Sequence, residues 1–190
     1  MASSEEKIIA AAIRHLNKEP TASMARLAEA IGTSRATLHR HFASREILIH
    51  TLGTRSLDRW EESQREAGLA EAAASGDAER IAAALRTVMR LFVADADEYG
   101  FALTDHFMAQ MPDLVARADE LEEREIVFYT AAQRAGVLRP DLPVRWISYT
   151  VYGLLVAARD SLRYGNVARR DLDQLVLETF LNGNAARGTP

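Results

Sequence analysis

The side chains best suited to contact a charged partner gather between residues 34 and 45. This stretch combines hydroxyl, imidazole and guanidinium groups, which hydrogen-bond to phosphate oxygens and to the edges of nucleic-acid bases. The predicted DNA contacts are Ser34, Arg35, Ala36, Thr37, His39, Arg40, His41 and Arg45. Arg45 is expected to bind a phosphate together with the backbone N–H groups at the start of a long helix.

The sequence argues against metal sites and catalysis. The chain has no cysteine, which excludes disulfides, thiolate nucleophiles and cysteine-based zinc sites. His39 and His41 are two residues apart, and such positions on a helix do not face the same way. No metal or cofactor is therefore predicted. The best catalytic candidate, His106, is interpreted as a polar residue of a pocket or core, so we predict that the protein is not an enzyme.

Charge is divided unevenly along the 190 residues. Residues 1–55 hold eight Lys and Arg against five Glu, together with four of the five histidines. The remainder holds 15 basic and 22 acidic residues. A small basic head and a larger acidic body indicate a nucleic-acid-binding module joined to a second domain. No apolar run is long enough to cross a membrane and the first twenty residues lack a signal sequence, so no membrane partner and a cytoplasmic location are expected.

The elements that must position these side chains are helices. Apolar residues recur with helical spacing in most segments, and no segment alternates as a strand would. The fold class predicted is all-α with about nine helices. The expected helices cover residues 4–17, 24–31, 35–42, 45–66, 78–96, 101–111, 113–135, 144–164 and 170–181.

Residues 24–42 are predicted to form a helix-turn-helix. Ser23 and Ser34 are suited to cap the two short helices, and Gly32 can adopt the left-handed conformation needed between them. Leu38 and Phe42 are expected to face the core, which leaves the polar side of the second helix for a DNA major groove.

This segment resembles the head of the TetR family of transcriptional regulators. The resemblance rests on Leu27-Ala28, Gly32-Thr33-Ser34, Thr37-Leu38-His39-Arg40-His41-Phe42 and Arg45-Glu46-Ile47-Leu48, although His39 stands where the family usually has an aromatic residue. The resemblance implies a helix-turn-helix DNA-binding domain at 1–50 and a helical ligand-binding and dimerisation domain at 51–190. It further implies a repressor that a small-molecule effector releases from a pseudo-palindromic double-stranded DNA operator.

The body contains a set of residues that are candidates for the effector site or, equally, for an ordinary core. The ligand-binding candidates are Phe101, His106, Phe107, Met111, Phe128, Tyr129, Tyr149 and Tyr152. A run of charged residues from Asp119 to Glu125 is interpreted as a solvated helix face.

The two last helices, at about 144–164 and 170–181, carry more apolar surface than one small body can cover. A homodimer through these helices would bury that surface and would set two recognition helices one helical turn of DNA apart, or a multiple of it. Two alternatives stay open at this point. One is a DNA-binding or protein-interaction factor that needs no inducer, and the other is a small-molecule-binding or catalytic helical domain with a vestigial head.

Overall fold

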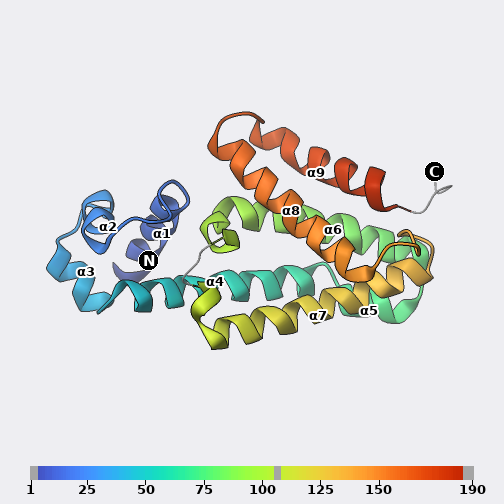
Figure 1. Ribbon diagram of the computed structural model, residues 1–190, viewed down its shortest axis with the longest axis horizontal. Coiled ribbons are helices and arrows are strands. Elements are labelled where there is room, and N and C mark those ends of the chain that lie inside the picture. The colour runs from blue at the N-terminus through green and yellow to red at the C-terminus, as the bar shows by residue number, and fades with distance from the viewer. Residues whose placement is uncertain (1–3, 105–107, 186–190) are drawn as a thin grey trace. The chain divides into compact units, whose positions relative to one another are not determined.

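The computed structural model describes residues 4–104 and 108–185. Within these ranges the chain is all-α, as predicted, with nine α-helices and two short 3-10 helices (Figure 1). The α-helices are α1 (Ser4–Leu16), α2 (Met24–Ile31), α3 (Arg35–His41), α4 (Arg45–Glu66), α5 (Leu69–Ser75), α6 (Ala78–Glu98), α7 (Pro112–Arg134), α8 (Val144–Arg163) and α9 (Arg169–Asn184). The 3-10 helices are η1 (Gly100–Thr104) and η2 (Met108–Gln110).

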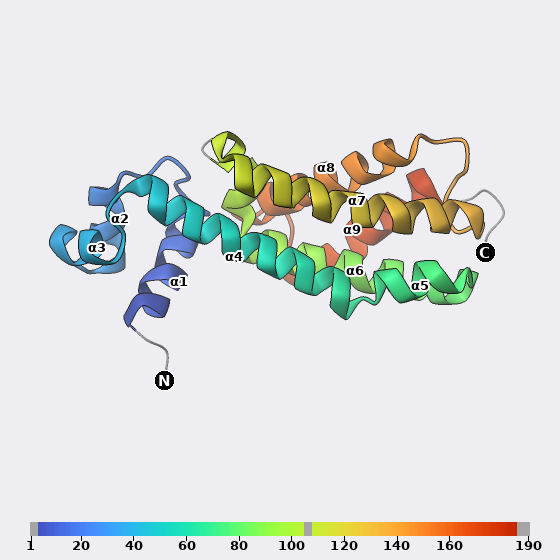
Figure 2. The same ribbon diagram turned by 90° about the horizontal axis from the view of Figure 1, so that it is seen from below.

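The chain divides into two compact units, and the first comprises residues 1–58 and 98–116. In this unit α1, α2 and α3 gather beside the first half of α4 (Figure 2). Its core contains Leu16, Leu27, Leu38 and Leu48, which are fully buried. Helix α1 is tied to α4 by an ion pair in which Arg55 donates to Glu6 at 2.8 Å.

Residues 98–116 of the first unit pack against its N-terminal part at Asn17 and Gly53. The Asn17 side chain accepts a hydrogen bond from the Phe101 N–H at 2.9 Å and donates to the Glu98 carbonyl at 2.7 Å. A Cβ atom on Gly53 would lie 2.7 Å from Leu114 Cδ1, so the glycine permits this close approach of α4 to the start of α7.

The second unit comprises residues 59–97 and 117–190 and contains the larger core. Helices α6, α7, α8 and α9 all contribute buried side chains, of which Phe128, Tyr129 and Phe180 are the largest. Helices α8 and α9 pack directly against each other (Figure 1). On this antiparallel pair Trp146, Tyr149 and Leu175 are exposed to solvent.

The structure differs from the sequence prediction at three places. The sequence did not predict α5, which begins after Gly68 in the left-handed conformation (φ 67°) and buries Leu69 and Ala72 at i, i+3 spacing. The helix expected at 101–111 is replaced by η1 and η2, with residues 105–107 outside the described ranges. Helix α4 also continues without interruption through the expected domain boundary at residue 50.

Among the described residues, no helix is long and apolar enough to cross a membrane.

Candidate functional site

The two short helices of the head have well-defined ends. The Ser23 hydroxyl caps α2 by accepting from the Arg26 N–H at 3.3 Å. At the other end Gly32 is left-handed (φ 74°), and the Thr33 N–H donates to the Ala28 carbonyl at 2.9 Å. Together with the Gly32 N–H bond to Glu29, this is a Schellman ending, which turns the chain sharply into α3. The helix-turn-helix predicted for residues 24–42 is therefore present.

Helix α3 is anchored on one side and open on the other. Leu38 and Phe42 are buried in the head, while Arg35, Ala36, His39 and Arg40 are exposed. The exposed guanidinium groups of Arg35 and Arg40 give this outer face a positive charge. Such a face offers hydrogen-bond donors of the kind that contact base edges and phosphates in a major groove.

Ser34 and Thr37 form a small hydroxyl unit at the start of α3. The Ser34 Oγ accepts from the Thr37 backbone N–H at 3.0 Å and donates to the Thr37 hydroxyl at 2.9 Å. Ser34 is therefore the N-cap of α3. It also fixes the orientation of the Thr37 hydroxyl in the first turn of the helix, the end that lies nearest the base edges in a helix-turn-helix.

The two histidines of α3 have different surroundings. His39 is exposed, and its Nδ1 lies 3.2 Å from the Ala43 carbonyl, so this nitrogen is the donor of that hydrogen bond. His41 is half-buried, and its Nδ1 lies 3.4 Å from a carboxylate oxygen of Glu5 on α1. The structure thus places His39 on the outer face of α3 and His41 against α1.

Arg45 occupies a position that the sequence did not suggest. Its Nε donates to the Ala22 carbonyl at 3.1 Å and one terminal nitrogen donates to the Pro20 carbonyl at 2.8 Å. The side chain is half-buried, and these bonds fasten the segment before α2 to the first turn of α4. A structural role in the head is therefore visible for this residue, beside the phosphate contact that was expected.

The comparison with protein families identifies the head. Residues 8–52 match the family model described as bacterial regulatory proteins, tetR family. This match runs from within α1 to the first turns of α4, the elements that hold the capped α3. The head of this chain is therefore similar to the N-terminal domain of the TetR family.

Solved structures extend the likeness of fold to the whole chain. A TetR-family regulator from Thermus thermophilus, PfmR, shares 17% identity with a TM-score of 0.71, over 100% of this chain and 99% of that one. The TetR-like regulator LfrR from Mycobacterium smegmatis, in complex with proflavine, shares 21% identity with a TM-score of 0.70 over 93% of both chains. The ketosteroid regulator KstR2 of Mycobacterium tuberculosis shares 16% identity with a TM-score of 0.71, over 98% of this chain and 97% of that one.

Comparison with curated proteins gave no match. TetR-family proteins are DNA-binding transcription regulators without catalytic activity, so the match of the head supports the prediction of a DNA-binding regulator that is not an enzyme.

The described residues among those predicted for an effector site are divided between the two units. Phe101 and Met111 are buried in the first unit, whereas Phe128 and Tyr129 are buried in the core of the second. His106 and Phe107 lie outside the described residues. Tyr149 and Tyr152 are 59% and 46% exposed on α8, and so belong to a surface rather than to a closed cavity.

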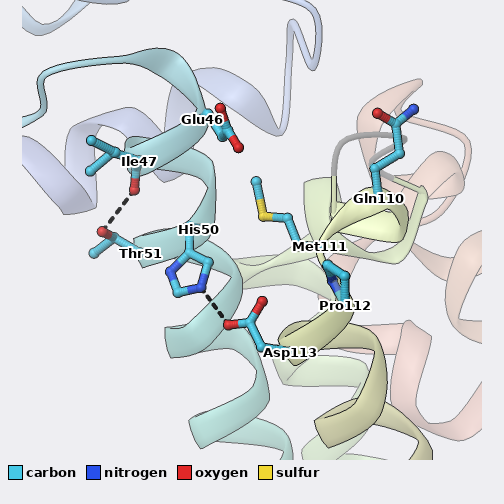
Figure 3. A pocket seen from close by; sticks show the side chains of 8 residues that line it. All are labelled: Glu46, Ile47, His50, Thr51, Gln110, Met111, Pro112 and Asp113. Atoms are coloured by element: carbon cyan, nitrogen blue, oxygen red, sulfur yellow. Dashed lines mark hydrogen bonds and ion pairs between the residues drawn. The ribbon is translucent and has the colours of Figure 1, made fainter.

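A pocket of about 410 Å³ lies within the first unit, and Met111 is the one predicted ligand residue that lines it among the residues that the structure describes. Figure 3 shows His50 on α4 facing Asp113 at the start of α7, with 2.6 Å between Nε2 and the carboxylate oxygen. The hydrogen bond from His50 lowers the pKa of the Asp113 carboxyl. The other lining residues are Glu46, Ile47, Thr51, Gln110 and Pro112.

The sequence analysis missed a buried polar cluster in the second unit. Glu125, expected on a solvated face, is only 3% exposed and lies in line with Leu121 and Phe128 on α7. Its carboxylate accepts from the Trp60 indole at 2.5 Å and from the Gln64 amide at 2.9 Å. The i, i+4 and i, i+3 spacing of Glu125 from those two apolar residues was the available signal.

Proposed function

We propose that this protein is a dimeric, cytoplasmic, ligand-responsive repressor, which a small molecule releases from a pseudo-palindromic operator. The observation that carries the proposal is α3, a short helix fixed by a Schellman turn and a serine cap, with Arg35, His39 and Arg40 on its exposed face. The roles are those of a recognition helix. Thr37 and His39 read base edges, and Arg40 neutralises phosphate.

The outer face of α8 supports assembly into a dimer. Trp146, Tyr149 and Tyr152 are 61%, 59% and 46% exposed, and Leu175 on α9 is 47% exposed. Trp146, Tyr149 and Tyr152 follow one another at intervals of three residues on α8, and soluble proteins usually cover exposed aromatic surface of this kind. A two-fold partner that offers the same surface covers it and gives two recognition helices for two half-sites.

Control by a small molecule is supported by two relatives and by the body of the chain. LfrR holds proflavine in its solved structure, and KstR2 is described as a ketosteroid regulator. In this chain the second unit contains a polar group buried inside an apolar core, which is the composition of a small-molecule site. An effector acts only to the extent that it binds the DNA-free conformation better than the DNA-bound one.

Selection of duplexes from a random-sequence pool tests the proposal. The protein is expected to enrich inverted repeats whose half-sites are about 10 base pairs apart, or a multiple of that spacing. A control chain with Arg35 and Arg40 both replaced by Ala is expected to enrich nothing. Enrichment of single half-sites would argue against the dimer, and binding without any enrichment would favour a general DNA-binding factor that needs no inducer.

A further inference from the structure

The carboxyl group of Glu125 is buried in the second unit without a cationic partner among the described residues. Its oxygens accept hydrogen bonds from the Trp60 indole, the Gln64 amide and the Tyr129 hydroxyl, the last at 3.3 Å. All three donors are neutral. When such a buried carboxyl group ionises, its charge is uncompensated, which is costly in an apolar core.

The nearby basic side chains are already paired with other acids. The arginines on the elements packed around this cluster form ion pairs as follows: Arg117 and Arg124 with Glu61, Arg145 with Glu122, and Arg59 with Asp95. Glu122 lies close enough to oppose ionisation of Glu125 rather than to favour it. These arginines therefore do not neutralise the Glu125 carboxylate, and its negative charge is left for a bound cation to balance.

Gln64 supplies a second, independent observation. Its amide nitrogen donates to the Leu121 carbonyl at 3.0 Å and to Glu125 at 2.9 Å, so both N–H bonds are used and the orientation of the amide is fixed. Turning the amide over would bring its oxygen against two other oxygens. In this orientation Gln64 Oε1 is buried and has no hydrogen-bond donor among the described residues, in a side chain that is 5% exposed. Buried oxygen atoms in proteins almost always accept a hydrogen bond, so we expect Gln64 Oε1 to accept one from a bound molecule.

We propose that Glu125 and Gln64 are the polar anchor of the effector site, and that the effector is an organic cation carrying N–H donors. This inference rests on the proposed small-molecule control and names the chemistry of its ligand. A protonated amine offers a positive charge to the Glu125 carboxylate and a further N–H to Gln64 Oε1, and the apolar neighbours Leu121 and Phe128 suit its hydrocarbon part.

The pH dependence of binding gives a first test, on the unaltered chain and without DNA. Burial raises the pKa of Glu125 to about 7, against the lowering effect of its three donors. The fluorescent probe 1-naphthylmethylammonium stays protonated between pH 6 and 8, whereas Glu125 passes from mostly neutral to mostly ionised. The affinity of the protein for this ammonium probe is expected to rise about tenfold from pH 6 to pH 8, because the ionised fraction of Glu125 rises by about that factor. The affinity of 1-naphthylmethanol, which is uncharged and of the same size, is expected to stay constant.

Substitution on α7 gives the second test. Wild-type protein at pH 8 is expected to prefer the ammonium over the alcohol by tenfold or more, and Glu125→Gln is expected to remove the preference and its pH dependence. Glu123→Gln, an exposed position two residues away, is the matched control and is expected to change neither. Equal affinity of wild type for both probes, or an unchanged preference in Glu125→Gln, overturns the inference. Because no DNA is present, a failure of operator binding would be a separate result.

Discussion

The guanidinium of Arg45 donates a hydrogen bond to the backbone carbonyl of Pro20, at 2.8 Å and across 25 residues of chain. A second bond, to Ala22, holds the same segment just before the Ser23 cap of α2. Arg45 stands at the first residue of α4. One side chain therefore fixes the entry to the helix-turn-helix from the helix that follows it.

Arg45→Ala is expected to loosen α2 as well as to weaken DNA binding. The substitution leaves two partly buried carbonyls without this donor, at a cost of about 1–3 kcal/mol. Hydrogen exchange of the α2 amides is expected to accelerate, while Arg40→Ala, at an exposed position, leaves it unchanged. If Arg45→Ala weakened DNA binding with full α2 protection, a phosphate contact alone would account for the residue.

Substitutions on α3 are expected to fall into two kinds. Thr37→Ala or His39→Ala should alter the preference among operator variants, since a lost base contact changes discrimination by about 1–3 kcal/mol. Arg40→Ala should weaken all duplexes alike and reduce the slope of log affinity against log salt by about one. Arg86→Ala on α6, an exposed arginine outside the head, is the control. Identical, sequence-blind effects of Thr37→Ala and Arg40→Ala would contradict these roles.

Glu125→Gln is expected to stabilise the protein, and increasingly so as pH rises. Burial raises the pKa of Glu125 from 4.5 to about 7 in the folded chain, so the folded state holds its proton more tightly than the unfolded state. Stability from this group is therefore lost as pH rises from about 4.5 to 7, by about 3 kcal/mol in total. Urea unfolding should show a small gain for Glu125→Gln at pH 5 and a gain of about 3 kcal/mol at pH 8. A gain independent of pH would show that the carboxyl is not buried.

Tyr149→Glu and Leu175→Glu are expected to convert a dimer into a monomer. Both side chains are about half exposed on α8 and α9, so the substitutions place charge on the outer surface without entering the core. Val176 is unsuitable for this purpose because it is 4% exposed and a charge there would disrupt the core. Val127→Glu, at a 64% exposed apolar position on α7, is the control. Sedimentation of the wild type as a monomer at micromolar concentration would contradict the interface.

The head could be predicted from sequence because its signals are local. Ser23, Gly32 and Ser34 act on neighbours within five residues, so their types and spacing are sufficient to place two helices and a turn. The same holds for Leu38 and Phe42, whose spacing places both on the buried side of α3.

The rest depended on contacts between distant residues. Arg45 donates to backbone carbonyls more than twenty residues earlier in the chain. Every residue has a backbone carbonyl, so residue types do not indicate which of them will accept such a bond. Glu125 was assigned to the surface because it stands in an acidic run. Its partners Trp60 and Gln64 lie on another helix, about sixty residues earlier, so the local sequence does not indicate that they bury it. The aromatic residues of the body were ambiguous for the same reason. Helical spacing assigns a face to Tyr149 but not the element that covers it.

The assignment of α3 as a recognition helix is tested most directly by the ratio of two affinities, for the selected inverted repeat and for a scrambled duplex of the same composition. Both are measured by fluorescence anisotropy at two salt concentrations. A sequence-specific regulator is predicted to prefer the repeat by about 10³-fold or more at physiological salt, with a steep loss of affinity for both duplexes as salt rises. A preference below about tenfold at both salt concentrations would contradict that assignment.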